Sequence, residues 1–178
     1  METTITEALA ELKTIKKRVQ KKQESIGRYF ARQGNVRDPL EKDGGSADFI
    51  SRERQGITDL HARFINIRTG IQAANLKNSL GICNKNRSVA EWLVWRREVA
   101  ESERQHVAGL VANLENIRNE ARRKDLAIVS TESGDPGEIV ISVDERALAE
   151  ESEHIEEVLG VLDGKLSLFN ATTTIELN

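Results

Sequence analysis

The sequence predicts a mainly α-helical protein: a long antiparallel helical hairpin that resembles a coiled coil, a third long helix, a short C-terminal helix and a small β-hairpin. Two long segments carry apolar residues at seven-residue spacing, and two helix-start motifs precede helical runs. Few residues are aromatic (4%) and only 2 of 178 are Pro, which is typical of long helices. The length fits one domain. We expect a three-helix region over residues 1–125 and a small α+β region over residues 126–178 packed on it.

The first helix is predicted from residue 5 to about residue 33. Thr4 and Glu7 have the spacing of a capping box, in which the hydroxyl accepts from the third helical amide and the Glu reaches back. Two seams at heptad spacing follow: Ile5, Leu12, Val19 and Ile26 in one, and Ala8, Ile15, Lys22 and Tyr29 in the other. We expect Gly34 to supply the left-handed turn that ends this helix.

A second helix of similar length follows the loop over residues 35–46, whose Asp38-Pro39 and Gly44-Gly45 pairs break helices. It should end near residue 75. Its seams have the same spacing: Ile50, Ile57, Phe64 and Ile71 in one, and Leu60, Ile67 and Ala74 in the other. Glu53 interrupts the second of these seams near the helix start. Two helices with matching stripes and one connecting loop predict an antiparallel hairpin.

The rest of the chain predicts a loop, a helix, two strands and a helix. Residues 77–87 are polar and loop-like, and Ser88 and Glu91 form a second capping box. The third helix then has these apolar positions: Val89, Trp92, Trp95, Val99, Val107, Leu110, Leu114 and Ile117. Residues 126–129 and 138–143 flank a Gly-Asp-Pro-Gly turn and predict a β-hairpin. Asp144 should cap a helix of about 19 residues that stops at Gly164, and residues 172–177 favour a strand over a continued helix.

Charge is distributed unevenly along the chain. Eight basic residues crowd the first helical segment, whereas residues 132–163 hold eleven acids and a single Arg, Arg146. A basic helix is compatible with a solvated flank, with binding to phosphates or anionic lipid, or with the acidic helix of another copy or of its own chain. Because the net charge is −3, we expect no nucleic-acid partner, and a membrane partner is disfavoured.

The sequence shows neither a Gly-rich phosphate loop nor a nucleophile elbow. Two Glu-x-x-His motifs, Glu103–His106 and Glu151–His154, are the pattern of a di-metal site in helical bundles, and Glu53 could add a carboxylate. Chance matches are the favoured explanation, because the chain is Glu-rich, the fourth helix is short and the first helix offers no carboxylate in its apolar stripe. We therefore expect no catalytic residue, metal or cofactor. We expect Cys83 to remain a reduced thiol without a His partner, and His61 to lie on a helix flank.

Trp92 and Trp95, with Arg96 and Arg97, form the most distinctive local cluster of the third helix. Two Trp three residues apart lie on neighbouring faces of one helix. They serve either as core anchors or as a protein-binding anchor, since Trp and Arg are enriched at binding hot spots. The candidate interface residues are Ile50, Ile57, Phe64, Ile71, Trp92, Trp95 and Arg96.

Several short motifs carry a family resemblance when taken in order: Ile5-Thr6-Glu7-Ala8-Leu9, Asp38-Pro39-Leu40, Ile65-Asn66-Ile67-Arg68, Arg87-Ser88-Val89-Ala90-Glu91-Trp92-Leu93, Leu162-Asp163 and Glu176-Leu177. Together they resemble the septicolysin-like family of small helical proteins of bacteria and their phages. The resemblance implies a candidate virion or assembly protein of the phage-encoded type, and it brings no catalytic residue. The Gly-Ser-rich first loop and the strand segment 126–143 depart from the bacterial members, whose name implies cytolysis.

These observations predict a non-enzymatic structural or assembly protein that forms homo-oligomers through its helical seams. The resemblance implies a place in a phage virion, with other virion structural proteins as partners, after assembly in the host cytoplasm; otherwise we expect the chain in the cytoplasm. One alternative is a membrane-active, pore-forming protein, although the chain contains no apolar run of about 18 residues. The other alternative is a di-metal carboxylate enzyme built on a helical bundle.

Overall fold

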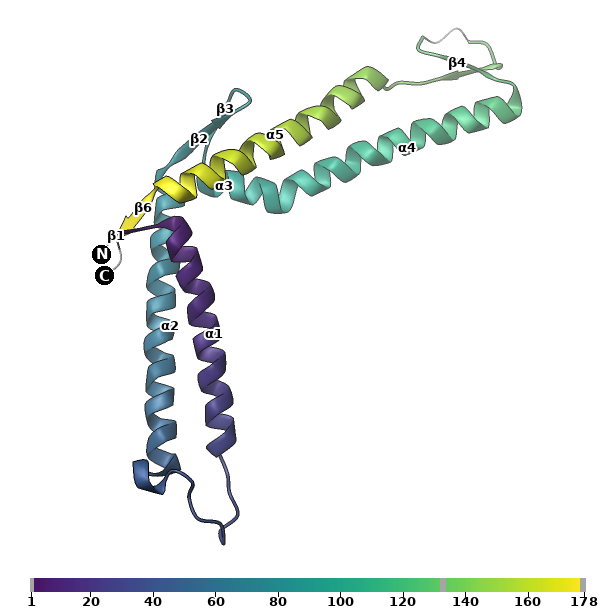
Figure 1. The fold of residues 1–178 in the computed structure, drawn as a ribbon. Coiled ribbons are helices and arrows are strands. Elements are labelled where there is room, and N and C mark those ends of the chain that lie inside the picture. Colours follow the sequence, from purple (N-terminus) through teal and green to yellow (C-terminus); the bar gives the residue numbers. More distant parts are fainter. Residues whose placement is uncertain (1, 132–133, 177–178) are drawn as a thin grey trace. The chain divides into compact units, whose positions relative to one another are not determined.

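The computed structural model describes residues 2–131 and 134–176, and its fold is mainly α, as predicted (Figure 1). The elements in chain order are β1 (Glu2–Thr4), α1 (Ile5–Tyr29), the 3-10 turn η1 (Glu41–Asp43), α2 (Gly45–Lys77), β2 (Ser79–Ile82), β3 (Lys85–Ser88), α3 (Val89–Val94), the π-helical segment η2 (Trp95–Val99), α4 (Ala100–Lys124), β4 (Ala127–Val129), β5 (Glu138–Val140), α5 (Glu145–Thr172) and β6 (Thr174–Glu176). They form two units. The first contains residues 2–78 and 167–176, and the second contains residues 79–166. This division differs from the boundary expected at residue 125, because the third helix belongs with the segment that follows it.

The first unit contains the predicted antiparallel hairpin, in which α1 and α2 lie side by side (Figure 1). α1 begins at the predicted capping box: the Glu7 amide donates to Thr4 Oγ1 over 3.3 Å, and the Thr4 amide donates to Glu7 Oε2 over 2.9 Å. The Thr4 amide first, and then the Thr4 and Thr3 hydroxyls, donate to the Glu7 carboxylate and lower its pKa. The helix ends at Tyr29, earlier than expected, and Gly34 does not have a positive φ. The prediction of a left-handed turn at Gly34 is therefore wrong.

An ion pair joins the two polar residues that interrupt the apolar seams. Lys22 Nζ of α1 lies 3.0 Å from Glu53 Oε1 of α2, and the side chains are only 30% and 21% exposed. Gly56 makes room for this contact, because a Cβ at that position would lie 3.0 Å from the Lys22 ammonium. A second ion pair joins the two helices with the charges the other way round: Arg63 Nε of α2 lies 2.9 Å from Glu11 Oε1 of α1. Charge therefore fixes which residues of α1 and α2 face each other.

Burial in the hairpin decreases from the strand end toward the loop. Ile5, Ile67 and Ile71 are buried beside the strands, whereas Ile57 and Phe64 are only half-buried further along. At the buried end, β1 and β6 pair antiparallel, and the Ile5 amide donates to the Thr173 carbonyl over 3.0 Å. The favoured strand at residues 172–177 is thus confirmed over Thr174–Glu176.

The loop between α1 and α2 is held by the Asp38 carboxylate. It accepts hydrogen bonds from the Ser46 hydroxyl at 2.6 Å, the Ser46 amide at 2.9 Å and the Leu40 amide at 2.9 Å. These donors, Ser46 first, lower the Asp38 pKa to about 2. Gly44 and Gly45 have φ values of 96° and 90°, a conformation that Gly adopts without steric cost. Asp38 therefore supplies acceptors to the first turn of α2, whose own N-cap residue is Gly44.

A β-hairpin forms in the second unit where a polar loop was expected. β2 and β3 pair antiparallel, with Ile82 facing Lys85 across a two-residue turn of Cys83 and Asn84. Both turn residues have positive φ, 45° and 62°, as two-residue hairpin turns require. Asn favours that conformation, but Cys does not. Only one of the two turn residues is therefore of a type that predicts a two-residue hairpin turn.

The third helix is confirmed, but the π-helical segment η2 divides it. From α4 onward, buried residues recur every seven positions at Ala100, Val107, Leu114 and Ala121. Val99, expected in the apolar stripe, is 38% exposed, and Ala100 is 2% exposed. A π turn accommodates one extra residue in the helix, so the stripe shifts by one position after Trp95.

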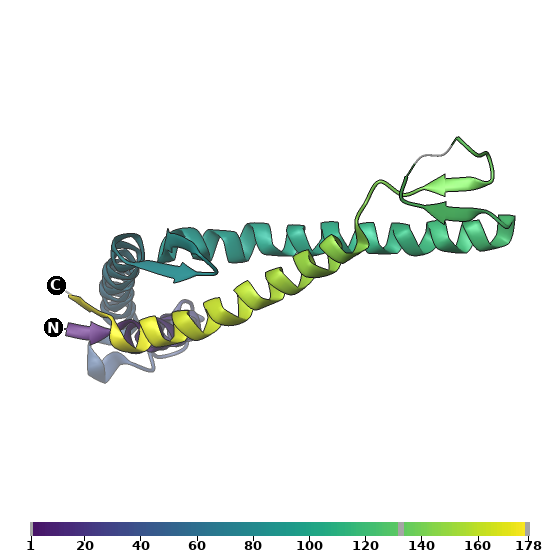
Figure 2. The same ribbon diagram turned by 90° about the horizontal axis from the view of Figure 1, so that it is seen from above.

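The C-terminal region corrects two predictions. β4 and β5 form within the predicted segments, but they pair in parallel rather than as a hairpin, and their arrows point the same way in Figure 2. The Ala127 amide donates to the Gly137 carbonyl over 2.9 Å, so the chain has already returned to the start of β4 before β5 begins. α5 begins after Asp144, which accepts from the Arg146 amide at 2.9 Å as expected, but it continues past Gly164 to Thr172.

Removing one partner of the Lys22–Glu53 pair should destabilise the chain, because the remaining half-buried charge loses its hydrogen-bond partner. For Lys22→Leu and for Glu53→Leu we expect a loss of about 1–3 kcal/mol in the free energy of unfolding. The double variant Lys22→Leu/Glu53→Leu should be close to neutral, since apolar replacement of both partners removes the desolvation cost. Urea unfolding of both single variants and the double variant measures the coupling, and strictly additive effects would show that the pair does not interact.

The lowered pKa of Asp38 gives a pH prediction. Its contribution to stability is present above the unfolded pKa of about 3.9 and is lost as the pH falls toward the folded value of about 2. The carboxyl carbon of Asp38 should titrate near that value in an NMR experiment. Ser46→Ala removes the principal donor and should move the midpoint back toward 3.8; an unchanged midpoint would mean that Ser46 does not hold Asp38.

The shifted stripe can be tested with two neighbouring residues. Ala100→Asp places a carboxylate in a buried position and should cost about 2–4 kcal/mol in the free energy of unfolding. Val99→Asp adds the same group at an exposed position and should cost about 1 kcal/mol or less. Chemical denaturation distinguishes the two variants, and a larger loss for Val99→Asp would support an uninterrupted α-helical stripe.

Candidate functional site

The interface residues predicted on α2 differ in exposure. Ile71 is buried inside the hairpin, whereas Ile50, Ile57 and Phe64 are half-buried. An open groove of about 550 Å³ runs along this part of α2. The groove, called the α2 groove below, is lined by Ala47, Ile50, Ser51, Arg54, Gln55, Ile57 and Thr58. Ile65 lies on the same helix one heptad after Thr58 and is 64% exposed.

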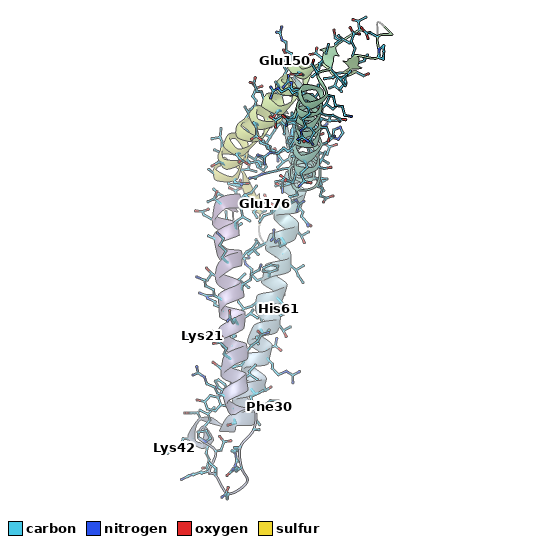
Figure 3. The ribbon with its side chains drawn as sticks, turned by 90° about the vertical axis from the view of Figure 1, so that its right-hand side faces the viewer. Lys21, Phe30, Lys42, His61, Glu150 and Glu176 are labelled. Atoms are coloured by element: carbon cyan, nitrogen blue, oxygen red, sulfur yellow. The ribbon has the colours of Figure 1, made fainter. Side chains whose placement is uncertain are left out.

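Basic side chains surround the hairpin seam. Lys16 Nζ of α1 lies 5.8 Å from the centre of the Phe64 ring, and the Arg68 guanidinium of α2 lies 5.9 Å from it. Within the described ranges, Lys22 is the one basic residue of α1 that forms an ion pair. Figure 3 shows Lys21 and His61 on the two helices of the hairpin, and both residues are exposed. His61 is therefore a flank residue, as expected.

The Trp cluster serves mainly as a core anchor. Trp92 is 1% exposed, and its indole N–H donates to the Leu80 carbonyl over 2.9 Å. The Trp95 ring meets it edge-on at 5.7 Å, and the Arg87 guanidinium lies 5.0 Å from the Trp92 ring. Trp92 is therefore not accessible to a partner, which corrects its place among the interface candidates. Trp95 is half-buried, and its indole donates to Glu103 over 3.2 Å.

Three arginines pair with acidic residues of α5 inside the second unit. Arg96 lies 2.9 Å from Asp163, Arg104 lies 2.7 Å from Glu156, and Arg118 pairs with Glu145. Part of the acidic surplus predicted for this region thus meets arginines of η2 and α4. Glu151 and Glu153 form no ion pair within the part of the chain that the structure describes.

The two Glu-x-x-His motifs do not come together as a di-metal site. Glu103 accepts a hydrogen bond from Trp95, and Glu53 pairs with Lys22. Across residues 2–131 and 134–176, the metal-ligating side chains that cluster are a different set. The geometry of the described residues gives no support to the di-metal alternative.

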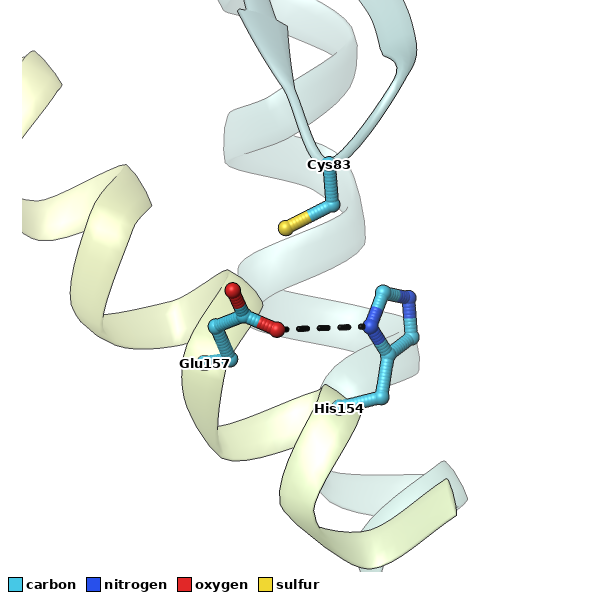
Figure 4. Close-up of side chains that lie close together, drawn as sticks. All are labelled: Cys83, His154 and Glu157. Carbon is cyan, nitrogen blue, oxygen red and sulfur yellow. Dashed lines mark ion pairs between the residues drawn. The ribbon is translucent and has the colours of Figure 1, made fainter. Parts of the chain in front are cut away.

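That set combines Cys83 with His154 and Glu157, and it is called the Cys83 cluster below. Their ligand atoms all lie within 4.8 Å of one another, and His154 Nδ1 lies 3.8 Å from Glu157 Oε2. Figure 4 shows the Cys83 sulfur directed from the turn between β2 and β3 toward two side chains on one face of α5. Cys83 is half-buried, whereas His154 and Glu157 are exposed.

Sequence spacing could not reveal this cluster, because its members are far apart in the chain. His154 and Glu157 alone form a common i, i+3 pair on a helix. Cys83 joins them only because the unpredicted hairpin brings its turn to α5. The sequence analysis did not predict this proximity of Cys83 to a His, whose possible ligand atoms lie within 4.8 Å of each other. A thiol, an imidazole and a carboxylate at this separation can bind a metal ion together.

No protein-family model, no curated protein and no solved structure matches this chain. The resemblance to the septicolysin-like family therefore stays a prediction. Among the residues that the structure describes, none of the helices combines the length and the apolar character that a membrane crossing requires.

Proposed function

We propose that this chain is a non-enzymatic assembly protein that associates with further copies of itself through the α1–α2 hairpin. The observation that carries the proposal is the incomplete cover of the apolar seam. Ile50, Ile57 and Phe64 remain half-buried, and the α2 groove beside them is open. A two-helix hairpin leaves such a seam partly in water, and an additional helix would bury it.

A second copy is the occupant that the charges favour. α1 carries six basic residues without an ion pair among the described residues: Lys13, Lys16, Lys17, Arg18, Lys21 and Arg28. Glu151 and Glu153 of α5 supply acidic groups of the opposite sign on the same chain. Copies of this chain therefore present both signs to one another, and such complementarity steers orientation more than it adds affinity.

The family resemblance suggests where this assembly takes place. In the phage-encoded type that the sequence resembles, the chain would be a virion component assembled in host cytoplasm beside other structural proteins. Detecting the chain in purified phage particles tests this part of the proposal separately from self-association.

Replacing Ile65 by Glu tests the assembly surface without touching the hairpin core. Because Ile65 is mostly exposed, Ile65→Glu should leave the helical circular dichroism and the unfolding midpoint nearly unchanged. It should shift the oligomer toward monomer by at least about tenfold in the dissociation constant, since a charge in an apolar contact costs more than about 1.4 kcal/mol. Native mass spectrometry and sedimentation velocity of the full chain at micromolar concentration measure the change.

Val111→Glu is the matched control, because it adds the same charge at an exposed aliphatic residue of α4. We expect Val111→Glu to retain the oligomer. Raising the salt concentration should also weaken association, because exposed charges are screened beyond about 10 Å at 0.1 M. A wild-type chain that stays monomeric throughout the micromolar range would refute self-association.

A further inference from the structure

We propose that Cys83, His154 and Glu157 bind one Zn²⁺ ion, which links the turn of the β2–β3 hairpin to α5. The proposal concerns the second unit alone and does not depend on self-association through α1 and α2. It rests on three different ligand types that converge from segments about seventy residues apart in the sequence.

The ligand chemistry favours zinc over calcium and magnesium. Thiolate, imidazole and carboxylate are the three side-chain groups that bind Zn²⁺ in proteins. Ca²⁺ and Mg²⁺ prefer oxygen ligands alone, so a sulfur and a nitrogen in the set disfavour both. On binding, the Cys83 thiol would release its proton to solvent, while His154 would bind as the neutral imidazole and Glu157 as the carboxylate.

The separations fit a tetrahedral ion after small side-chain movements. Zn–N and Zn–O bonds of about 2.0–2.1 Å and Zn–S bonds of about 2.3 Å place neighbouring ligand atoms about 3.3–3.7 Å apart. His154 Nδ1 and Glu157 Oε2 lie 3.8 Å apart, and no pair in the Cys83 cluster exceeds 4.8 Å. His154 and Glu157 are exposed and can close the remaining distance, whereas the half-buried Cys83 is held by its turn.

Other contacts hold the two elements together before any ion binds. Lys165 of α5 donates a hydrogen bond to the Gly81 carbonyl of β2. Ile82, next to Cys83, is buried. The hairpin is thus positioned against α5 independently of the cluster. Three protein ligands leave a fourth position of the ion for water, which is the arrangement of an open zinc site.

Titration with Co²⁺ tests the site, because Co²⁺ takes the place of Zn²⁺ and reports its ligands by absorption. The full-length reduced chain should bind one Co²⁺ per chain and show a thiolate-to-cobalt charge-transfer band in the near ultraviolet. Added Zn²⁺ should abolish the band, since Zn²⁺ binds more tightly than Co²⁺ in the same site. Equilibrium dialysis with Zn²⁺ alone measures the affinity.

Cys83→Asn is the most informative variant, because Asn suits the positive φ of this turn and the hairpin should fold at least as well. It should lose the charge-transfer band completely. His154→Ala and Glu157→Gln should each weaken Zn²⁺ binding by more than about tenfold, since even outer-shell partners of metal ligands contribute that much. His106→Ala, which removes an exposed His on α4, is the matched control and should bind like the wild type.

Three results would overturn the proposal: no charge-transfer band in the wild type, a band that persists in Cys83→Asn, or one Co²⁺ bound per two chains. Circular dichroism of each variant shows whether a loss of binding reflects a loss of folding. Because Cys83→Asn is compatible with the turn, a folded variant without the band directly assigns the sulfur to Cys83.

Discussion

A narrow apolar stripe is the constraint on which the rest of the structure depends. Two helices that meet through heptad seams can slide by seven residues and still match apolar with apolar. In α1 and α2 such a slide would place Lys22 opposite Leu60 instead of Glu53, since both belong to the same seam of α2. The observed pair, at 3.0 Å, therefore selects one register from several that the apolar pattern allows. The buried strand end of the hairpin can form only in that register.

The same narrow stripe explains why the two units use their charges differently. In the second unit, three arginines flank the α4 stripe and pair with α5, so charge completes a contact inside the chain. In the hairpin, two cross-helix pairs fix the register, and most basic residues of α1 are left facing water. Such pairs contribute little to stability where they are exposed. Their role here is selection of register and orientation.

The elements that local sequence controls could be predicted. Both capping boxes form with the predicted partners, and Asp144 caps α5, because a cap depends on residues within one turn of each other. The extended α5 was missed because a single Gly164 does not end a helix whose apolar stripe continues through Leu166 and Phe169. The heptad spacing likewise predicted the helical hairpin, but it could not predict how the chain divides into two units.

The features that depend on distant residues could not be predicted. The π turn has no recognisable sequence pattern. It is evident only in the structure, where Ala100 rather than Val99 occupies the buried stripe. The parallel pairing of β4 and β5 depends on the path of the intervening chain, and turn residues alone suggested a hairpin. The Cys83 cluster was invisible for the same reason, since its spacing exists only after β2 and β3 have paired. Among the candidate interface residues, the sequence pattern could not distinguish the half-buried Ile50 and Ile57 from the buried Trp92.

Cys83 has a backbone conformation that is unfavourable for its residue type, and its side chain lies close to His154 and Glu157. A left-handed conformation costs a side chain other than Gly or Asn about 1–2 kcal/mol, and the first position of this turn would form more easily with either of those residues. Packing of the Cys83 side chain offsets little of that cost, because the side chain is only half-buried. What the position does provide is a sulfur directed at an imidazole and a carboxylate on α5. Backbone strain in a folded chain is maintained where the surrounding structure imposes it and is frequently associated with function. At Cys83 the turn that imposes the strained backbone also brings the thiol close to His154 and Glu157. A metal ion bound by the three side chains would therefore link the β2–β3 hairpin to α5, two elements that are far apart in the sequence.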